Sequence, residues 1–141
     1  PVSVHDERAW VLQASSGEHD KAFAIETAEG EHIGNIGLHG IHYLDRRAEL
    51  GILIGTKERW SQGYGTDAIL TLLKFAFEEM GLHRVYLRVD ADNTRAIRCY
   101  EKCGFIHEGT FRDATFRRGK YIDQHFMSVL DHEYRRREER Q

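Results

Sequence analysis

Two glycines separated by one residue, Gly63 and Gly65, constrain the fold of this chain more than any other feature of its sequence. They lie in the run Arg-Trp-Ser-Gln-Gly-Tyr-Gly-Thr-Asp-Ala of residues 59–68, between an apolar run and a helical pattern. Glycines let the backbone turn tightly and let a ligand approach the main chain. Because N–H groups at a helix N-terminus carry partial positive charge, the pair predicts a phosphate-binding turn. A plain strand-to-helix turn would use the same residues, and no Lys-Ser or Lys-Thr follows, which excludes a P-loop.

The residues before this turn predict strands for most of their length. Alternating apolar residues favour strands at 21–27, 32–39 and 48–54, which would pair as three antiparallel neighbours. Gly51, inside the third of these strands, predicts a bulge or a close approach by another group. Residues 4–14 have the pattern of the end of an amphipathic helix. A helix so near the start would imply that the first elements of the fold are missing from the sequence.

After the turn, helices and strands alternate. The expected elements are a helix at 67–80, a strand at 84–90, a helix capped by Asn93, and two strands at 105–112 and 121–130. The order β-β-β-α-β-α-β-β predicts an α+β fold, a mixed and mostly antiparallel sheet with helices packed on it.

The composition fits a soluble globular domain. Hydrophobic residues make up 40% and charged residues 30% of the 141 residues, and the net charge of -3 gives no reason to expect nucleic-acid binding. No apolar run approaches the roughly 20 residues of a membrane span, and no signal peptide is visible, so we expect a cytoplasmic protein without membrane contact. Cys99 and Cys103 are expected to be reduced thiols. The nine histidines form no ligand motif, so we expect no metal site.

A second motif, at residues 93–105, reads Asn-Thr-Arg-Ala-Ile-Arg-Cys-Tyr-Glu-Lys-Cys-Gly-Phe. Together with the glycine turn it resembles the GNAT superfamily of acyl-CoA-dependent N-acyltransferases, in the branch of ribosomal-protein alanine and spermidine-type N-acetyltransferases. The resemblance covers nearly everything from Ile33 to Tyr134. It implies a GNAT-type sheet with splayed central strands and helices on both faces. Residues 1–141 would form one such domain, without its N-terminal strand and helix.

The resemblance also implies acetyl-CoA as the cosubstrate. Backbone amides of the turn would hold its pyrophosphate, and exposed backbone groups at the end of the preceding strand would pair with its pantetheine arm. The residues expected to bind it are Leu53, Ile54, Gly55, Gln62, Gly63, Tyr64, Gly65, Thr66 and Asn93. Trp60 stands where many members carry Arg or Gln, so the phosphates would depend more on backbone amides.

The implied reaction is direct attack of an amine on the thioester. Glu49, on the strand that faces the gap, is the candidate base for the amine's proton, although a solvent-facing strand residue would look the same. Tyr100 matches the family tyrosine that gives a proton to the leaving thiolate, and helix packing is its alternative explanation. Asn93 could cap its helix, contact the cofactor, or do both. A main-chain N–H near Ile52 or Leu53 would stabilise the oxyanion.

Two other functions fit parts of the sequence. A GNAT-like domain could bind acyl-CoA as a sensor or scaffold without turnover. Gly63-x-Gly65-x-x-Ala68, with Asp90 after the next strand, also fits an NAD-binding Rossmann pattern, but its glycines lie too far from the preceding strand.

The acceptor amine stays open between a small molecule, such as a polyamine or aminoglycoside, and a protein N-terminus. Relatives often form dimers or larger assemblies, so self-association, a homodimer included, is also implied.

Overall fold

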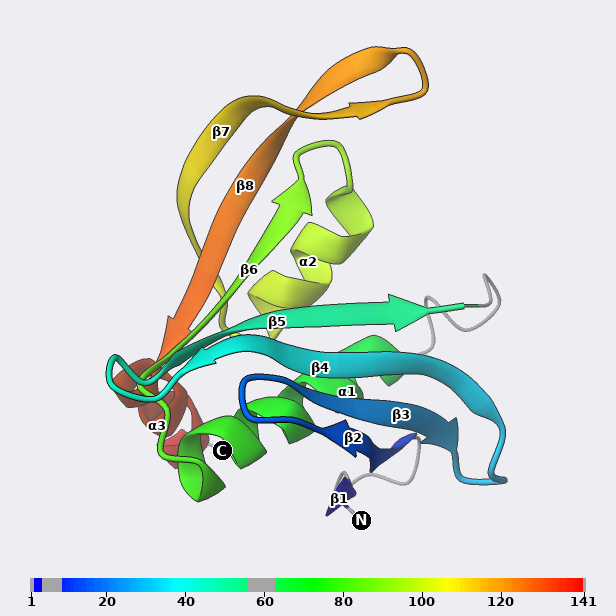
Figure 1. The fold of residues 1–141 in the computed structure, drawn as a ribbon, viewed down its shortest axis with the longest axis vertical. Helices are drawn as coiled ribbons and strands as arrows, with labels where there is room; N and C mark the ends of the chain where they lie inside the picture. The colour runs from blue at the N-terminus through cyan, green and yellow to red at the C-terminus, as the bar shows by residue number, and fades with distance from the viewer. Residues whose placement is uncertain (1, 4–8, 56–62, 141) are drawn as a thin grey trace.

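A computed structural model describes residues 2–3, 9–55 and 63–140 of the chain (Figure 1). In these ranges eight strands form one sheet in the order β1-β2-β3-β4-β5-β6-β8-β7. The strands are β1 Val2–Ser3, β2 Ala9–Ser16, β3 Lys21–Thr27, β4 His32–His42, β5 Arg47–Ile54, β6 Arg84–Asp90, β7 Ile106–Arg117 and β8 Lys120–Leu130. The helices are α1 Tyr64–Lys74, the π-helical turn η2 Phe75–Glu79, α2 Thr94–Lys102 and α3 Asp131–Glu139.

The two central strands separate soon after they meet. β5 and β6 are the only parallel neighbours among the described strands, and they pair only where Arg47, Ala48 and Glu49 face Arg84, Val85 and Tyr86. Beyond this point β5 stays paired with β4, while β6 stays paired with β8. Figure 1 shows the two strands diverging from their shared end. The splayed central strands expected from the resemblance are therefore confirmed.

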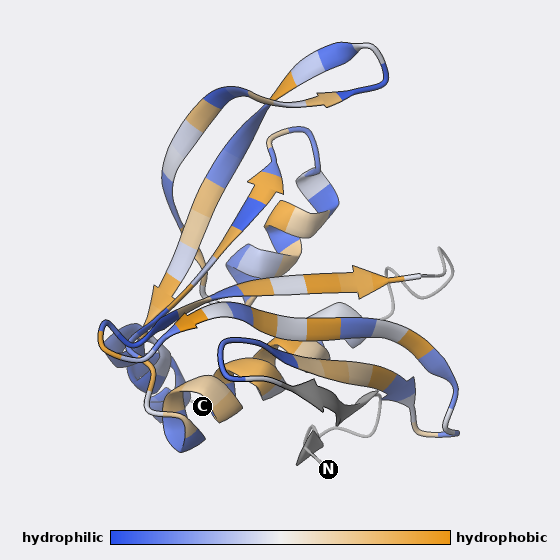
Figure 2. Ribbon diagram, viewed as in Figure 1, coloured by the Kyte–Doolittle hydropathy of each residue, from blue (hydrophilic) through white to orange (hydrophobic). Residues whose placement is uncertain are grey.

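One hydrophobic core lies between the sheet and the helix that follows the glycine turn. The predicted apolar stripe of that helix is buried at Ile69, Leu72, Leu73 and Ala76, whose exposed fractions do not exceed 1%. It packs on alternate residues of β4, β5 and β6, and Figure 2 shows hydrophobic residues along both layers. The buried residues from those strands are Ile36, Leu38, Ala48, Leu50, Val85, Leu87 and Val89. This burial fixes which face of each strand points toward α1.

The opposite face of the sheet is not covered by any helix within the described residues. We call it the outer face. Its side chains alternate with the core residues and are half-buried or exposed, among them Asn35, His39, Glu49 and Arg88. The expectation of helices on both faces is met on the core face only, and for the outer face it stays a prediction.

The helix expected at residues 4–14 is wrong for residues 9–14. These residues belong to β2, which pairs antiparallel with β3 from Ala9 opposite Thr27 to Ser16 opposite Lys21. Residues 4–8 lie outside the described ranges. The edge of β3 offers a row of unpaired N–H and C=O groups, and satisfying them favours a strand over an isolated helical turn. Together with β1, this strand raises the number before the glycine turn from the expected three to five.

The later elements follow the prediction more closely. β6 spans the predicted residues, and Asn93 caps α2 as expected. α1 begins at Tyr64, before the predicted start at 67, because Gly63 turns the chain with a φ of 85°. β7 runs to Arg117 instead of ending near 112, because the last hairpin pairs as far as Arg117 opposite Lys120. No helix among the described residues has the length and apolar character needed to cross a bilayer.

Candidate active site

The divergence of β5 and β6 opens a cavity of about 400 Å³ on the core face. It is bounded by the end of β5, the start of α1 and one face of α2. Its lining residues are Ile52, Leu53, Ile54, Gly65, Ile69, Asp92, Asn93, Thr94, Arg95, Ala96, Cys99 and Tyr100. The structure thus brings together the end of β5, the glycine turn and the motif of residues 93–105, which are separate in the sequence. We call this space the central cavity.

The glycine turn forms the N-terminus of α1. Gly63 precedes the helix in a left-handed conformation, and no side chain caps the helix there. The first N–H groups of a helix have no partner within it, so those of Gly65 and Thr66 suit an anion. A Cβ at Gly65 would lie 3.6 Å from both Cys99 Sγ and Ile54 Cδ1, so this glycine lets α1 approach α2 and β5 closely. Gln62 lies outside the described residues, and its contact with the cofactor stays a prediction.

The edge of β5 that faces the gap is the second expected binding feature. Leu53 and Ile54 pair with Asn35 and Gly34 of β4, while their other edge faces the gap. That edge is available to an extended ligand that pairs like a strand. Gly55 does not line the central cavity, and its N–H donates to the Ile33 carbonyl at 2.9 Å, so its contact with the cofactor stays a prediction.

A second cavity, of about 440 Å³, adjoins the glycine turn and carries positive charge. It shares Gly65, Thr94, Arg95 and Cys99 with the central cavity. Its other lining residues are Gly63, Thr66, Arg98 and Lys102. Arg98 and Lys102 were not among the binding residues predicted from the sequence. The signal was the spacing of basic residues at 95, 98 and 102, which places them on one side of a helix.

Asn93 caps α2 as predicted, and its contact with the cofactor stays a prediction. Its side-chain oxygen accepts a hydrogen bond from the Ala96 N–H at 3.3 Å, which caps α2. The same residue lines the central cavity. A cap and a cofactor contact are therefore geometrically compatible.

Tyr100 lines the central cavity from α2. Its ring packs edge-on against Phe105, with 5.8 Å between the centroids. Burial, followed by the nearby Cys99 and Cys103 thiols, raises the pKa of Tyr100 to about 12. The phenol therefore stays protonated near neutral pH and can donate a proton or a hydrogen bond into the cavity.

The two cysteines are free thiols, as predicted. Cys99 Sγ lies 3.4 Å from Thr66 Oγ1, and Cys103 is buried beside the Thr66 carbonyl. The hydrogen bond from Cys103 lowers the pKa of Cys99, while the same bond raises the pKa of Cys103. Both thiols hold α2 against the start of α1. No group of three or more potential metal ligands occurs among the described residues.

Glu49 lies on the outer face, at the point where β5 and β6 part. Its two carboxylate oxygens accept hydrogen bonds from Arg88 at 2.7 and 3.2 Å. Glu49 does not line the central cavity. An incoming amine would have to compete with the guanidinium, so the role of Glu49 as base stays a prediction.

The chain matches known proteins over most of its length. Residues 1–106 match the family described as Acetyltransferase (GNAT) domain. The spermidine N(1)-acetyltransferase of Vibrio cholerae is 36% identical over 124 residues, which are 86% of this chain and 71% of that enzyme. The Escherichia coli K12 enzyme of the same name is 32% identical, over 83% of this chain and 62% of its own length. The putative ribosomal N-acetyltransferase YdaF of Bacillus subtilis is 34% identical, over 75% of this chain and 57% of its length.

Solved structures agree with the sequence comparison. The V. cholerae spermidine N-acetyltransferase in complex with CoA and spermine superposes with a TM-score of 0.78 at 33% identity, over 83% of this chain and 69% of that one. A dodecameric structure of that enzyme gives a TM-score of 0.80, over 85% of this chain and 70% of that one. These TM-scores show that the chain shares the fold of these proteins.

The splayed sheet, the glycine turn and the family match define an acetyl-CoA-dependent N-acetyltransferase. The chain belongs to the GNAT acetyltransferase family. This excludes the Rossmann interpretation, because the strands before the glycine turn are antiparallel and the sheet is not doubly wound. The chain spans about 60 to 70% of the length of the spermidine N-acetyltransferases it matches.

Proposed function

We propose that this chain transfers the acetyl group of acetyl-CoA to a primary amine, and that the acceptor is a polyamine. The observation that carries the proposal is the central cavity, which joins the glycine turn to Tyr100 through the gap between β5 and β6. The polyamine is favoured because the V. cholerae and E. coli relatives are named spermidine N(1)-acetyltransferases. A protein N-terminal amine is the second candidate, because another relative is named a putative ribosomal N-acetyltransferase.

The proposed reaction assigns separate binding and proton-transfer roles to residues of the chain. Amides at the start of α1 hold the pyrophosphate, and the edge of β5 that faces the gap near Leu53 pairs with the pantetheine arm. Bound acetyl-CoA supplies an activated acyl group as a thioester. Tyr100, kept protonated by its raised pKa, gives a proton to the leaving sulfur. Glu49 stands at the point where the strands part, and its charge would attract an ammonium group.

An acceptor screen tests this function. Purified protein is incubated with acetyl-CoA and, in separate reactions, spermidine, spermine and a peptide with a free α-amine, and free thiol is measured over time. Thiol release that depends on spermidine or spermine supports the polyamine. Release with the peptide alone would move the acceptor to a protein N-terminus. Binding of acetyl-CoA without any acceptor-dependent release would instead support a sensor or scaffold.

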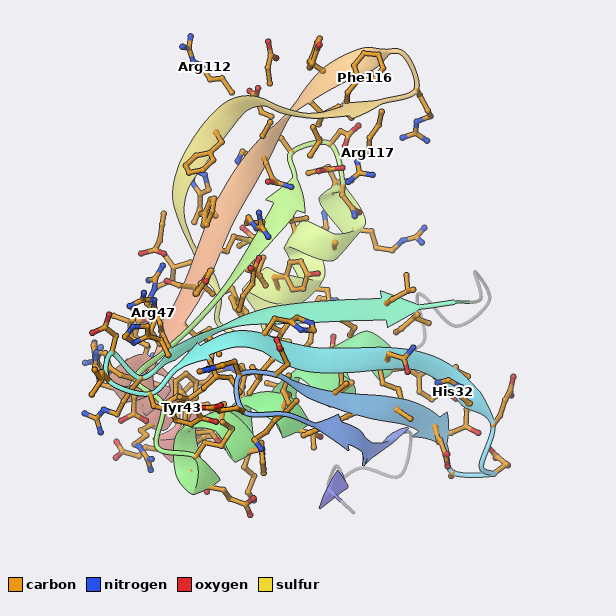
Figure 3. The ribbon with its side chains drawn as sticks, viewed as in Figure 1. His32, Tyr43, Arg47, Arg112, Phe116 and Arg117 are labelled. Atoms are coloured by element: carbon orange, nitrogen blue, oxygen red, sulfur yellow. The ribbon has the colours of Figure 1, made fainter. Side chains whose placement is uncertain are left out.

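Self-association, with a homodimer as its simplest form, is proposed from the last hairpin. β7 and β8 project beyond the rest of the sheet and expose large apolar side chains (Figure 3). Phe111, Phe116 and Tyr121 are 58%, 62% and 64% exposed. One relative has a structure described as dodecameric. Light scattering on the wild type and on Phe116→Ser tests the proposal: a single monomeric mass for both proteins would contradict it.

A cytoplasmic location also stays a proposal.

A further inference from the structure

A separate cavity of about 310 Å³ lies on the outer face, over the middle of β4 and β5. Its lining residues are Ala22, Asn35, Ile36, Gly37, His39, Gly51, Ile52 and Leu53. Ile52 and Leu53 also line the central cavity. The two cavities therefore meet at the same two residues of β5, one on each face of the sheet.

His39 is the one ionisable side chain that lines the outer cavity. Its ring lies over two glycines, Gly37 on its own strand and Gly51 on β5. A Cβ at Gly51 would be 3.1 Å from His39 Nε2, and one at Gly37 would be 3.4 Å from the same atom. Gly51 therefore allows the His39 ring to approach the backbone of β5 closely. A close approach by another group was one of the two roles predicted for this glycine. The register of β4 shifts just after His39, at Gly40 with a φ of 58°, and such a bulge re-aims the neighbouring side chain.

Asp20 orients the imidazole. Its Oδ1 lies 3.5 Å from His39 Nδ1 and also accepts a hydrogen bond from the Gly40 N–H at 3.2 Å. A carboxylate beside Nδ1 favours the tautomer that carries its proton there. The lone pair of Nε2 is then left over the glycines, where the cavity lies. Asp20 therefore lies on the Nδ1 side of the ring, and the outer cavity lies on the Nε2 side.

The other charged groups near His39 are already paired with each other. Glu49 of β5 faces His39 directly in the strand register, and Arg88 of β6 occupies both oxygens of Glu49. Asp20 precedes β3, and its carboxylate is on the Nδ1 side of the ring. His39 Nε2 is therefore the acceptor that the geometry leaves available at this end of the sheet.

We propose that His39 accepts a proton from the acceptor ammonium as it enters through the outer cavity. This inference rests on the proposed N-acetyltransferase function and names a residue that performs it. Of the two protons that the ammonium loses, one passes to Nε2 and then to solvent. The other ends on the CoA sulfur by way of Tyr100, as the N–C bond forms and the C–S bond breaks.

The test compares His39→Gln with the wild type and with His42→Gln, an exposed histidine on the same strand that lines none of these cavities. For His39→Gln we expect kcat/KM for spermidine to fall about 100-fold, and its decline toward acid pH to disappear. The affinity for CoA, measured by calorimetry, should stay within about twofold of the wild type. His42→Gln should keep both the rate and the pH profile. Asp20→Asn should lower kcat more than it changes KM, because Asp20 acts through the ring.

Two further outcomes decide the inference. Activity of His39→Ala restored by added imidazole would support a proton-transfer role that a purely structural histidine could not show. A His39→Gln variant that keeps its rate within about threefold, with the acid decline intact, would overturn the inference while leaving the N-acetyltransferase in place. A wild type that releases no thiol with any amine would overturn the proposed function, and this inference with it.

Discussion

At the scale of single residues, Tyr100 is the side chain whose position and protonation together suit the departure of a thiolate. It lines the central cavity and keeps its proton because burial raises its pKa to about 12. We expect Tyr100→Phe to lower kcat about 100-fold, because the phenol proton is lost while the ring's packing against Phe105 remains. CoA affinity should change by less than about twofold. Thiol release and calorimetry measure the two quantities.

Tyr43→Phe is the matched control for this variant. Tyr43 lies at the turn between β4 and β5, near Arg47 at the end of the sheet where the strands meet, as Figure 3 shows. Its hydroxyl bonds to the Glu18 carbonyl and takes no part in the cleft. It should keep full turnover. Unchanged turnover in Tyr100→Phe would remove Tyr100 from the mechanism.

The raised pKa of Tyr100 also predicts how stability depends on alkaline pH. Folding raises the pKa from an ordinary value of 10.0 to about 12, so the folded state favours the neutral phenol. This contribution is fully present below about pH 10 and is lost as the pH rises toward 12, by at most about 2.7 kcal/mol. We expect the urea midpoint of the wild type to fall more steeply from pH 9.5 to 11 than that of Tyr100→Phe. Tyr134, whose pKa is also raised, by burial and by Glu78, is common to both proteins and drops out of the comparison. Parallel curves would contradict the shift.

At the scale of elements, the sequence was most informative where a local signal fixed an end. Asn93 predicted the start of α2, and the alternation of residues 84–90 predicted β6, because caps and alternation act within a few residues. The helix expected at 9–14 was wrong because the partner that decides it, the edge of β3, lies elsewhere in the chain. The ion pair of Glu49 with Arg88, and the placing of His39 over Gly51, depend on strand register in the same way. Neither could be read from spacing alone.

Asn93 allows the cap and the cofactor contact to be separated. Asn93→Ala should lower the free energy of unfolding by about 1 kcal/mol, because the Ala96 N–H loses its acceptor. Asn93→Ser should keep most of that stability, since serine caps helices about as well. Urea unfolding measures both. If Asn93→Ser keeps its stability but loses affinity for acetyl-CoA, the amide contacts the cosubstrate; if affinity is also kept, the residue is a cap only.

The basic side of α2 predicts which part of CoA binds there. Arg98 and Lys102 line the cavity beside the glycine turn, where their charge can supplement the backbone amides. We expect the double variant Arg98→Gln, Lys102→Gln to bind CoA about tenfold more weakly than the wild type, because charge-assisted contacts to phosphate are lost. At high salt the difference between the two proteins should be smaller, because salt screens these contacts. If these residues hold the 3′-phosphate, the double substitution should reduce the affinity for dephospho-CoA less than it reduces the affinity for CoA. Lys74→Gln, at the exposed end of α1, is the control and should bind as the wild type does.

At the scale of the whole molecule, the sheet consists of two parts joined by little backbone pairing. β1 to β5 form one part and β6 to β8 the other, and only three residue pairs of β5 and β6 connect them. The central cavity lies between these two parts, bounded by β5 and α1 on one side and by α2 on the other. A ligand that fills the cavity therefore contacts both parts at once. Because it binds the folded state alone, it should stabilise the molecule as a unit.

This arrangement predicts a large thermal shift with CoA. At a concentration about 100 times its Kd, a ligand specific for the folded state adds about 2.7 kcal/mol. For a domain of this size, that corresponds to a rise in Tm of roughly 8 °C. NAD at the same concentration should give no shift, because the glycine turn follows an antiparallel sheet and not a Rossmann strand. Tyr100→Phe should show the same CoA shift as the wild type, since its hydroxyl acts on the leaving group and not in binding. A shift of equal size with NAD, or none with CoA, would contradict specific binding of CoA to the folded chain.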